Sequence, residues 1–211
     1  MAPRRDVARR SFLDSVADLP LLTPTRDGWA ELAAANLGAF LADHAICEQQ
    51  AALFGLNLVA HYPDDPELVD QMTALAAEEV THLRRVSQLL HRRGLQPARR
   101  RANPYVQALH GHIRHSNEAE LKCDRLLVGA LIEARSCERF TRLLDQLADT
   151  DREVADLLYD LGPAEKRHWL AFHGLAGRGV ADEPFATRWR VWLELERDAM
   201  ASRGIDPTVH G

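Results

Sequence analysis

The chain has 211 residues and a net charge of −5, with 46% apolar, 27% charged and 6% aromatic residues. This composition is typical of one soluble globular domain rich in helix, and the absence of any apolar run of about 18 uncharged residues excludes a membrane span. The N-terminus lacks the apolar core of a secretory signal. The three cysteines have no CxxC spacing. We therefore expect reduced thiols, a cytoplasmic location and no membrane association.

The charge is unevenly distributed along the chain. The net negative charge argues against a general nucleic-acid-binding protein, yet residues 80–117 contain eight arginines and no Asp or Glu. Such a segment suggests a local anionic partner. A general preference for arginine over lysine, of which the chain has only two, explains the arginines but not the missing acids.

Two long helices are predicted in the first half of the chain. Apolar residues at helical spacing predict the first over 28–61, with Asp27 as its N-cap. The second begins with Asp65 as N-cap and Pro66 at the first helical position, and it ends before Gly94.

A long connection follows over residues 94–117. It contains a short helix that Asn103 and Pro104 open. A third long helix is predicted over 118–148.

The fourth long helix has a capping box at its start. Thr150 and Glu153 have the spacing in which each side chain satisfies the other's backbone N–H. Gly162 and Pro163 are expected to interrupt this helix, because proline lacks the N–H that an inner turn requires. A short C-terminal helix is predicted over 184–203.

These elements predict an all-α fold. Four long helices, with short links within each pair and a long crossover between helices two and three, indicate a four-helix bundle with extra short helices. We expect residues 1–25 to be irregular and residues 26–211 to form a single domain.

Two Glu-x-x-His motifs lie on the second and fourth predicted helices, Glu79–His82 and Glu165–His168. Residues three apart on a helix face the same side, so each carboxylate and imidazole can reach one metal ion. One such motif is weak support, since it often falls on a solvated helix face.

Two further glutamates strengthen the metal interpretation. Glu48 and Glu133 lie in otherwise apolar stretches of the first and third helices, where a carboxylate is costly unless it is paired or binds a cation. The spacing repeats, with 85 residues from Glu48 to Glu133 and 86 between the two Glu-x-x-His motifs. Four carboxylates and two histidines are the ligand set of ferritin-like di-iron or di-manganese sites. The alternative is a metal-free bundle with polar pairs in its core.

Some neighbouring residues have weaker claims to a role. His44 lies one turn before Glu48 and is expected to hydrogen-bond a ligand rather than bind metal. Cys137 is expected to be a small core residue.

Five strings carry a resemblance to a known family: DHAICE (43–48), EEVTH (78–82), RRG (92–94), LLVGALIEARSCERF (126–140) and AEKRH (164–168). Together they resemble the tRNA 2-methylthio-N(6)-isopentenyladenosine hydroxylases of the MiaE type, and the likeness covers nearly the whole chain. IEARSCERF is the most specific of them.

The resemblance implies a ferritin-like bundle with two iron ions, and manganese remains an alternative. It implies an O2-dependent monooxygenase that takes two electrons from a reductase with a ferredoxin-type carrier and hydroxylates the isopentenyl group of an adenosine beside the anticodon. The implied iron ligands are Glu48, Glu79, His82, Glu133, Glu165 and His168. The break expected at Gly162–Pro163 would shift Glu165.

The same resemblance gives the arginine-rich segment an expected role in binding the tRNA anticodon loop. Phosphate contacts would come from Arg92, Arg93, Arg99, Arg100 and Arg101. A solubilising loop is the alternative. Other functions left open are an iron store, a di-iron oxidase or peroxidase, and an oxygenase acting on a substrate other than tRNA.

Overall fold

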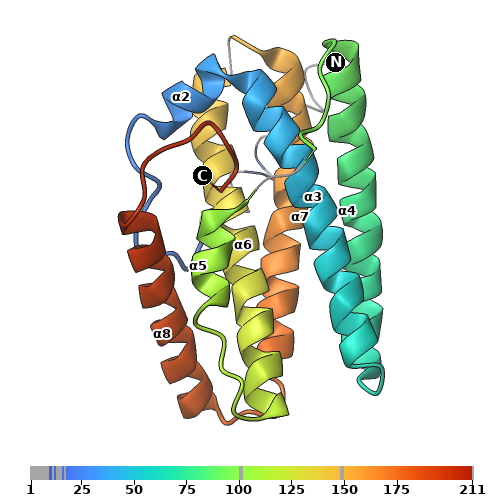
Figure 1. Ribbon diagram of the computed structural model, residues 1–211, viewed down its shortest axis with the longest axis vertical. Coiled ribbons are helices and arrows are strands. Elements are labelled where there is room, and N and C mark those ends of the chain that lie inside the picture. Colours follow the sequence, from blue (N-terminus) through green and yellow to red (C-terminus); the bar gives the residue numbers. More distant parts are fainter. Residues whose placement is uncertain are drawn as a thin grey trace. The chain divides into compact units, whose positions relative to one another are not determined.

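The computed structural model describes residues 10, 12, 16, 18–99, 102–147 and 150–210. Throughout these residues the regular structure consists of seven helices without a strand (Figure 1), which confirms the all-α prediction. None of the helices in the described part combines the length and apolar character needed to cross a membrane.

The chain divides into two compact units. We call the first the α3–α4 unit; it comprises residues 35–102 and 207–209. The second, the α6–α7 unit, comprises the chain as far as residue 34, residues 103–206 and the C-terminal end from His210. The expectation that residues 26–211 form one domain stays a prediction.

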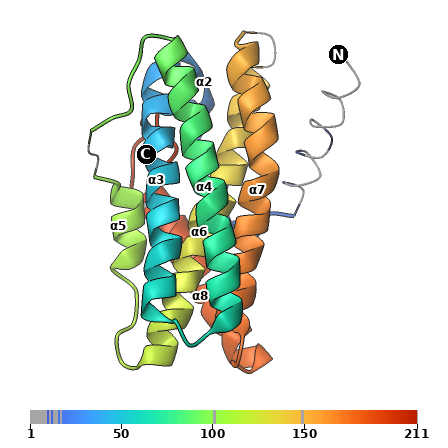
Figure 2. The same cartoon turned by 90° about the vertical axis from the view of Figure 1, so that its right-hand side faces the viewer.

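The α3–α4 unit is a pair of long helices, α3 (Leu37–His61) and α4 (Pro66–Arg92). They lie side by side along their length, as Figure 2 shows. The predicted start of α4 is confirmed, because the Asp65 carboxylate accepts a hydrogen bond from the Leu68 backbone N–H at 3.1 Å and Pro66 is the first helical residue. Past the helix end, Gly94 has φ 70°, a left-handed conformation that glycine adopts without strain.

The predicted single helix over 28–61 is wrong in one respect. It is two helices, α2 (Trp29–Ala35) and α3, separated by Asn36, whose φ of −129° and ψ of 43° are not helical. Asparagine is a poor former of helix interiors, because its side chain competes for backbone hydrogen bonds. Asp27 is not the residue that precedes α2; Gly28 is, with φ 83°.

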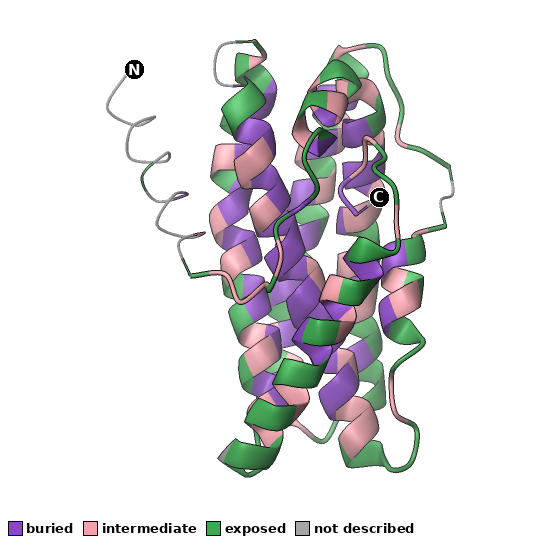
Figure 3. Cartoon of the chain, turned by 90° about the vertical axis from the view of Figure 1, so that its left-hand side faces the viewer, coloured by how far each residue is buried: buried purple, intermediate pink, exposed green. Residues whose placement is uncertain are grey.

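The α6–α7 unit contains a second pair of long helices, α6 (Glu118–Leu147) and α7 (Arg152–Gly177), which also lie side by side. The helix α8 (Asp182–Ala201) packs on α6 and on the short α5 (Pro104–His110). Its buried positions recur at helical spacing: Trp192, Leu193, Glu196, Ala199 and Met200. Figure 3 shows the exposed parts of the helices in green and the buried parts in purple. This spacing gives α8 one face buried against its neighbours.

The fourth long helix differs from its prediction at two points. Its cap is Asp151, which accepts from the Val154 N–H at 3.1 Å, whereas the Thr150 hydroxyl donates to the Gln146 carbonyl. Pro163 lies inside a continuous α7 and does not break it. The missing proline N–H removes one backbone bond, and the burial of Leu161, Gly162 and Ala164 on either side outweighs that loss.

Part of the N-terminal segment also departs from expectation. Arg10, Phe12 and Val16 are helical rather than irregular. The reason is packing: Phe12 is 1% exposed, and its ring meets Tyr159 of α7 edge-on at 5.6 Å. A ring placed there also needs Gly162, since a Cβ at that position would come within 2.0 Å of it.

Two arginines of the string IEARSCERF are buried in the α6–α7 unit. Arg135 is fully buried and forms an ion pair with Glu196 of α8 at 2.7 Å. Arg139 is 2% exposed and lies over the Trp29 ring at 4.8 Å. These residues hold α8 and the start of α2 against α6, so this part of the string has a structural role.

Candidate metal centre

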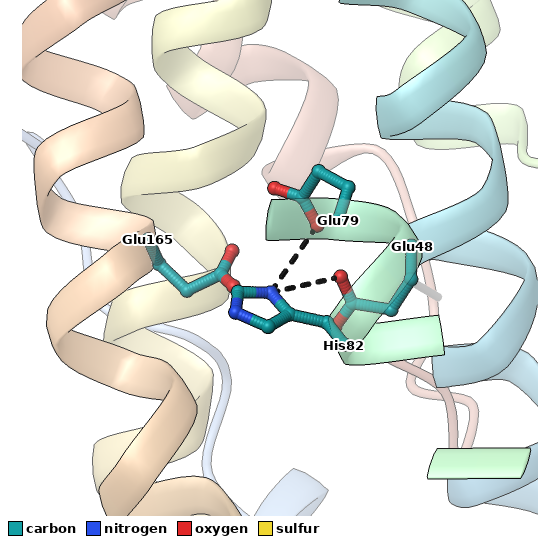
Figure 4. Close-up of side chains that lie close together, drawn as sticks. All are labelled: Glu48, Glu79, His82 and Glu165. Atoms are coloured by element: carbon teal, nitrogen blue, oxygen red, sulfur yellow. Dashed lines mark ion pairs between the residues drawn. The ribbon is translucent and has the colours of Figure 1, made fainter. Parts of the chain in front are cut away.

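The α3–α4 unit brings three of the predicted ligands together. Glu48, Glu79 and His82 are 4%, 1% and 7% exposed, and each offers a ligand atom within 4.8 Å of the others. The His82 Nδ1 atom lies 3.5 Å from Glu48 Oε2 and 3.4 Å from Glu79 Oε2, the contacts drawn in Figure 4. We call these three residues the α3–α4 half-site.

Helical periodicity explains why this half-site faces inward. Glu79 and His82 are three residues apart and share one face of α4. Between them, Val80 and Thr81 are exposed, Val80 by 54%. The apolar Val80 is exposed whereas the adjacent Glu79 is buried. The face of α4 on which each residue lies, and not its polarity, therefore decides which side chain is buried.

His44 lies where it can fix the Glu48 carboxylate. Its Nε2 atom is 2.5 Å from Glu48 Oε1, and both side chains are buried. Burial alone raises the pKa of Glu48, but the hydrogen bond with Glu79 and the His44 and His82 rings outweigh it, so that the pKa lies well below its usual range. A lowered pKa favours the ionised carboxylate that binding to a metal ion requires.

The α6–α7 unit brings together the other three predicted ligands. Glu133 of α6 and Glu165 and His168 of α7 are each 4% exposed, and their ligand atoms lie within 4.8 Å of one another. We call them the α6–α7 half-site. The continuous α7 keeps Glu165 and His168 in helical register, so the expected shift of Glu165 by Gly162–Pro163 does not occur.

Cys137 lies one turn after Glu133 and is fully buried, as expected of a core residue. Burial raises the pKa of its thiol, and the negative charges of Glu165 and Glu133 raise it further. The thiol donates a hydrogen bond to the Gly162 carbonyl at 3.7 Å. A protonated thiol that is already donating is a poor metal ligand.

The donor set of each half-site fits a divalent first-row metal ion. Each offers two carboxylates and one imidazole, which suit iron and manganese better than the softer metals that prefer thiolates. Buried carboxylates in such numbers are costly without a compensating cation, and a bound metal ion supplies that charge.

The predicted tRNA-binding arginines have less support. Arg92 and Arg99 are exposed, Arg93 is half-buried, and Arg100 and Arg101 lie outside the described residues. Another arginine of the 80–117 segment, Arg114, forms an ion pair within the protein: its Nε atom donates a hydrogen bond to the buried Asp124 carboxylate at 2.9 Å.

Comparison with known proteins gives one consistent family. The sequence profile of the tRNA-(MS[2]IO[6]A)-hydroxylases (MiaE) matches residues 13–211. A tRNA 2-(methylsulfanyl)-N(6)-isopentenyladenosine(37) hydroxylase of Pseudomonas putida is 39% identical over 153 residues, 72% of this chain and 73% of its own length. A hydroxylase of the same name from Salmonella typhimurium is 28% identical over 228 residues, covering 85% and 83% of the two chains.

Among solved structures, the chain is similar to a Synechococcus protein with aldehyde deformylating oxygenase activity. The TM-score is 0.82 and the sequence identity 31%, over 90% of this chain and 95% of the other. This likeness confirms the predicted ferritin-like fold class.

Proposed function

The chain belongs to the tRNA-(MS[2]IO[6]A)-hydroxylase (MiaE) family, and from this premise we propose that it hydroxylates the isopentenyl group of a hypermodified adenosine, position 37, beside the tRNA anticodon. The observation that carries the proposal is the pair of buried half-sites, each with two carboxylates and one imidazole within 4.8 Å. A tRNA-binding protein without redox chemistry has no use for such buried ligand sets.

The two half-sites together are proposed to hold two iron ions. The ligands are Glu48, Glu79, His82, Glu133, Glu165 and His168. The repeated spacing along the chain and the likeness to a ferritin-like oxygenase over 90% of the chain support this assignment. Manganese is the alternative metal, since the same donors suit it.

Bound iron would supply the activation of dioxygen and the oxidation of an allylic methyl carbon, with two electrons from an external reductase and a ferredoxin-type carrier. The chain's own residues do the rest. His44 holds the Glu48 carboxylate in one orientation through its 2.5 Å contact. The buried ring of Phe172, which lies against Gly129 of α6, provides an apolar wall beside the α6–α7 half-site and excludes water from it.

The arginine-rich segment is proposed to bind the phosphates of the anticodon loop. Arg92 and Arg99 are exposed near the end of α4, and they would contribute affinity and orientation rather than base recognition. Replacement of Arg99, Arg100 and Arg101 by Gln should weaken tRNA binding and reduce its dependence on salt concentration. Unchanged affinity and salt dependence would reject this part of the proposal. A cytoplasmic location, where tRNA occurs, follows from the same proposal.

A second candidate is an oxygenase that acts on a substrate other than tRNA. The likeness to the Synechococcus protein with aldehyde deformylating oxygenase activity favours it. An oxidase or peroxidase of the same fold would use similar ligands.

Mass spectrometry of tRNA nucleosides separates these functions. Cells that lack the protein should lose the hydroxylated prenyl-adenosine and accumulate its precursor. Expression of the chain should restore the product, and expression of the Glu133→Ala variant should not. An unchanged nucleoside profile would favour the non-tRNA oxygenase.

A further inference from the structure

A group of aromatic side chains in the α6–α7 unit has no role in the proposed metal chemistry. His173 of α7 lies at its centre, with ring centroids 5.8 Å from Trp169, 5.0 Å from Phe185 and 4.8 Å from Trp189. We call these four residues the aromatic cluster. Trp169 and His173 are four apart on α7, and Phe185 and Trp189 are four apart on α8, so each pair shares one helix face.

The cluster is only partly covered by protein. His173, Phe185 and Trp189 are all half-buried, and Gly174, next to His173, is exposed with open space where its Cβ would lie. The three ring contacts are tilted or edge-on, with interplanar angles of 60° to 67°. Rings that meet at such angles are not stacked face to face, so each contact covers at most one face of a ring and the opposite face of a half-buried ring can meet a planar ligand.

Two polar atoms in the cluster also lack a protein partner. Within the described part of the chain, neither the indole Nε1 of Trp169 nor Nε2 of His173 has a hydrogen-bond partner, although both atoms are buried. Trp169 itself is 8% exposed. A buried donor without a partner is costly, and a ligand with an acceptor removes that cost. Burial lowers the pKa of His173, so at neutral pH its imidazole is uncharged and has both a donor and an acceptor.

Two arginines flank the cluster in the sequence, as do the acidic Asp182 and Glu183 before Phe185. Arg190 directly follows Trp189, and Arg178 directly follows Gly177. Phe185 packs closely on α7 at Gly177, since a Cβ added there would lie 3.2 Å from the Phe185 ring. Both arginines are exposed. Half-exposed aromatic rings with flanking arginines are the combination by which proteins bind unpaired nucleotides, through base stacking and phosphate contact.

The cluster also lies next to the proposed chemistry along α7. Trp169 directly follows His168, and at about 100° per residue the cluster faces some 100° to 140° away from that ligand. A ligand of the cluster would therefore lie beside the metal ligands without occupying their place.

Resting on the proposed function, we propose that the aromatic cluster binds an unpaired nucleobase of the anticodon loop by stacking, next to the adenosine that is hydroxylated. Arg178 and Arg190 contact the adjoining phosphates. Stacking tolerates any base, so the cluster adds affinity and orientation without selecting a sequence.

Binding of a synthetic anticodon stem-loop RNA with a prenylated adenosine tests this proposal. Affinity is measured by fluorescence anisotropy of a labelled RNA at several salt concentrations, with the iron-loaded full chain. Trp189→Ala should weaken binding about 10-fold without changing the salt dependence, because stacking releases no counterions. Trp189→Phe should restore most of the affinity. Arg190→Gln should instead reduce the salt dependence.

Val191→Ala is the matched control. Val191 is an exposed apolar residue on α8, two positions after Trp189 and hence on the other side of that helix, and its truncation should leave binding unchanged. Circular dichroism of each variant confirms folding. If Trp189→Ala does not fold, His173→Ala serves in its place with the same expected loss.

The outcomes separate this inference from the proposed function. If the wild type binds the stem-loop and both Trp189→Ala and His173→Ala bind equally well, the stacking site is wrong while tRNA hydroxylation stands. If the wild type does not bind the stem-loop, both fail. Quenching of tryptophan fluorescence by the RNA that disappears in Trp189→Phe would support a base stacked on that ring.

Discussion

The two half-sites have the same residue types, two glutamates and one histidine, but different surroundings. Four residues before Glu48 stands His44, whose Nε2 atom contacts the carboxylate at 2.5 Å. Four residues before Glu133 stands Gly129, where a Cβ would come within 2.9 Å of the Phe172 ring. Glu48 is thus held by a close contact with an imidazole, whereas the residue one turn before Glu133 lies against an aromatic ring. The glutamate of the α3–α4 half-site thus has a polar neighbour one turn earlier, and the glutamate of the α6–α7 half-site has an apolar contact one turn earlier.

The largest expected effect is the loss of hydroxylation when the Glu-x-x-His residues of either half-site are replaced. Glu79→Ala with His82→Ala, or Glu165→Ala with His168→Ala, should each abolish hydroxylation, a loss on the order of 1,000-fold, because a catalytic metal contributes several kcal/mol. Product formation on prenylated tRNA measures it. Full activity in either variant would show that its half-site is dispensable for hydroxylation and would contradict the equal importance expected of the two half-sites.

The next largest effect concerns iron affinity and His44, which only the α3–α4 half-site has beside its glutamate. His44→Ala should weaken iron binding about 10- to 100-fold, as expected when a side chain that orients a ligand is lost. His44→Gln should recover part of the affinity, since its amide can still donate to Glu48. Competition with a chelator measures the affinity, and Gln49→Ala, an exposed neighbour on α3, is the control. Equal affinities of wild type and His44→Ala would leave the histidine without this role.

Replacement of Gly129 tests how closely the Phe172 ring packs against α6. Gly129→Ala should destabilise the fold by about 1–3 kcal/mol, because the new methyl group overlaps the buried Phe172 ring. Urea unfolding of the metal-free chain measures the change. Gly174→Ala on α7 is the matched control; its Cβ meets nothing within 4 Å, so it should stabilise by about 0.5–1 kcal/mol. If both variants shift stability alike, the contact with Phe172 is not tight.

A smaller effect concerns acid stability of the framework around Glu133. Burial raises the pKa of Glu138, but Arg135 and Thr25 outweigh it and lower the pKa below its ordinary 4.5. A carboxylate with a lowered pKa stabilises the fold above pH 4.5, and that contribution is lost as the pH falls further. Glu138→Gln should therefore cost about 1 kcal/mol at pH 7 and less at pH 3. A deficit that does not change with pH would exclude ionisation as the cause.

Much of this arrangement could be predicted from the sequence, because its signals are local. The Asp65–Pro66 helix start and the face shared by Glu79 and His82 depend on positions a few residues apart, and both are confirmed. The assignment of these residues to iron stays a prediction, since it depends on chemistry that the fold alone does not contain.

The errors arose where long-range packing overrides local rules. Pro163 remains inside α7 because the residues around it are buried, whereas the break at Asn36 had a local signal in the poor helix propensity of asparagine. The aromatic cluster escaped prediction, since Trp169 and His173 meet Phe185 and Trp189 only after α8 folds back. The spacing of four within each pair was the available signal.

The metal content of the two half-site variants tests the central claim most directly. Elemental analysis of the iron-loaded chain should give two ions per wild-type molecule. If all six proposed ligands hold the two ions jointly, Glu79→Ala with His82→Ala, or Glu165→Ala with His168→Ala, should lower the content to well below one ion. Two independent sites would retain one tightly bound ion in each variant, and that result, or a wild type without iron, would contradict the account.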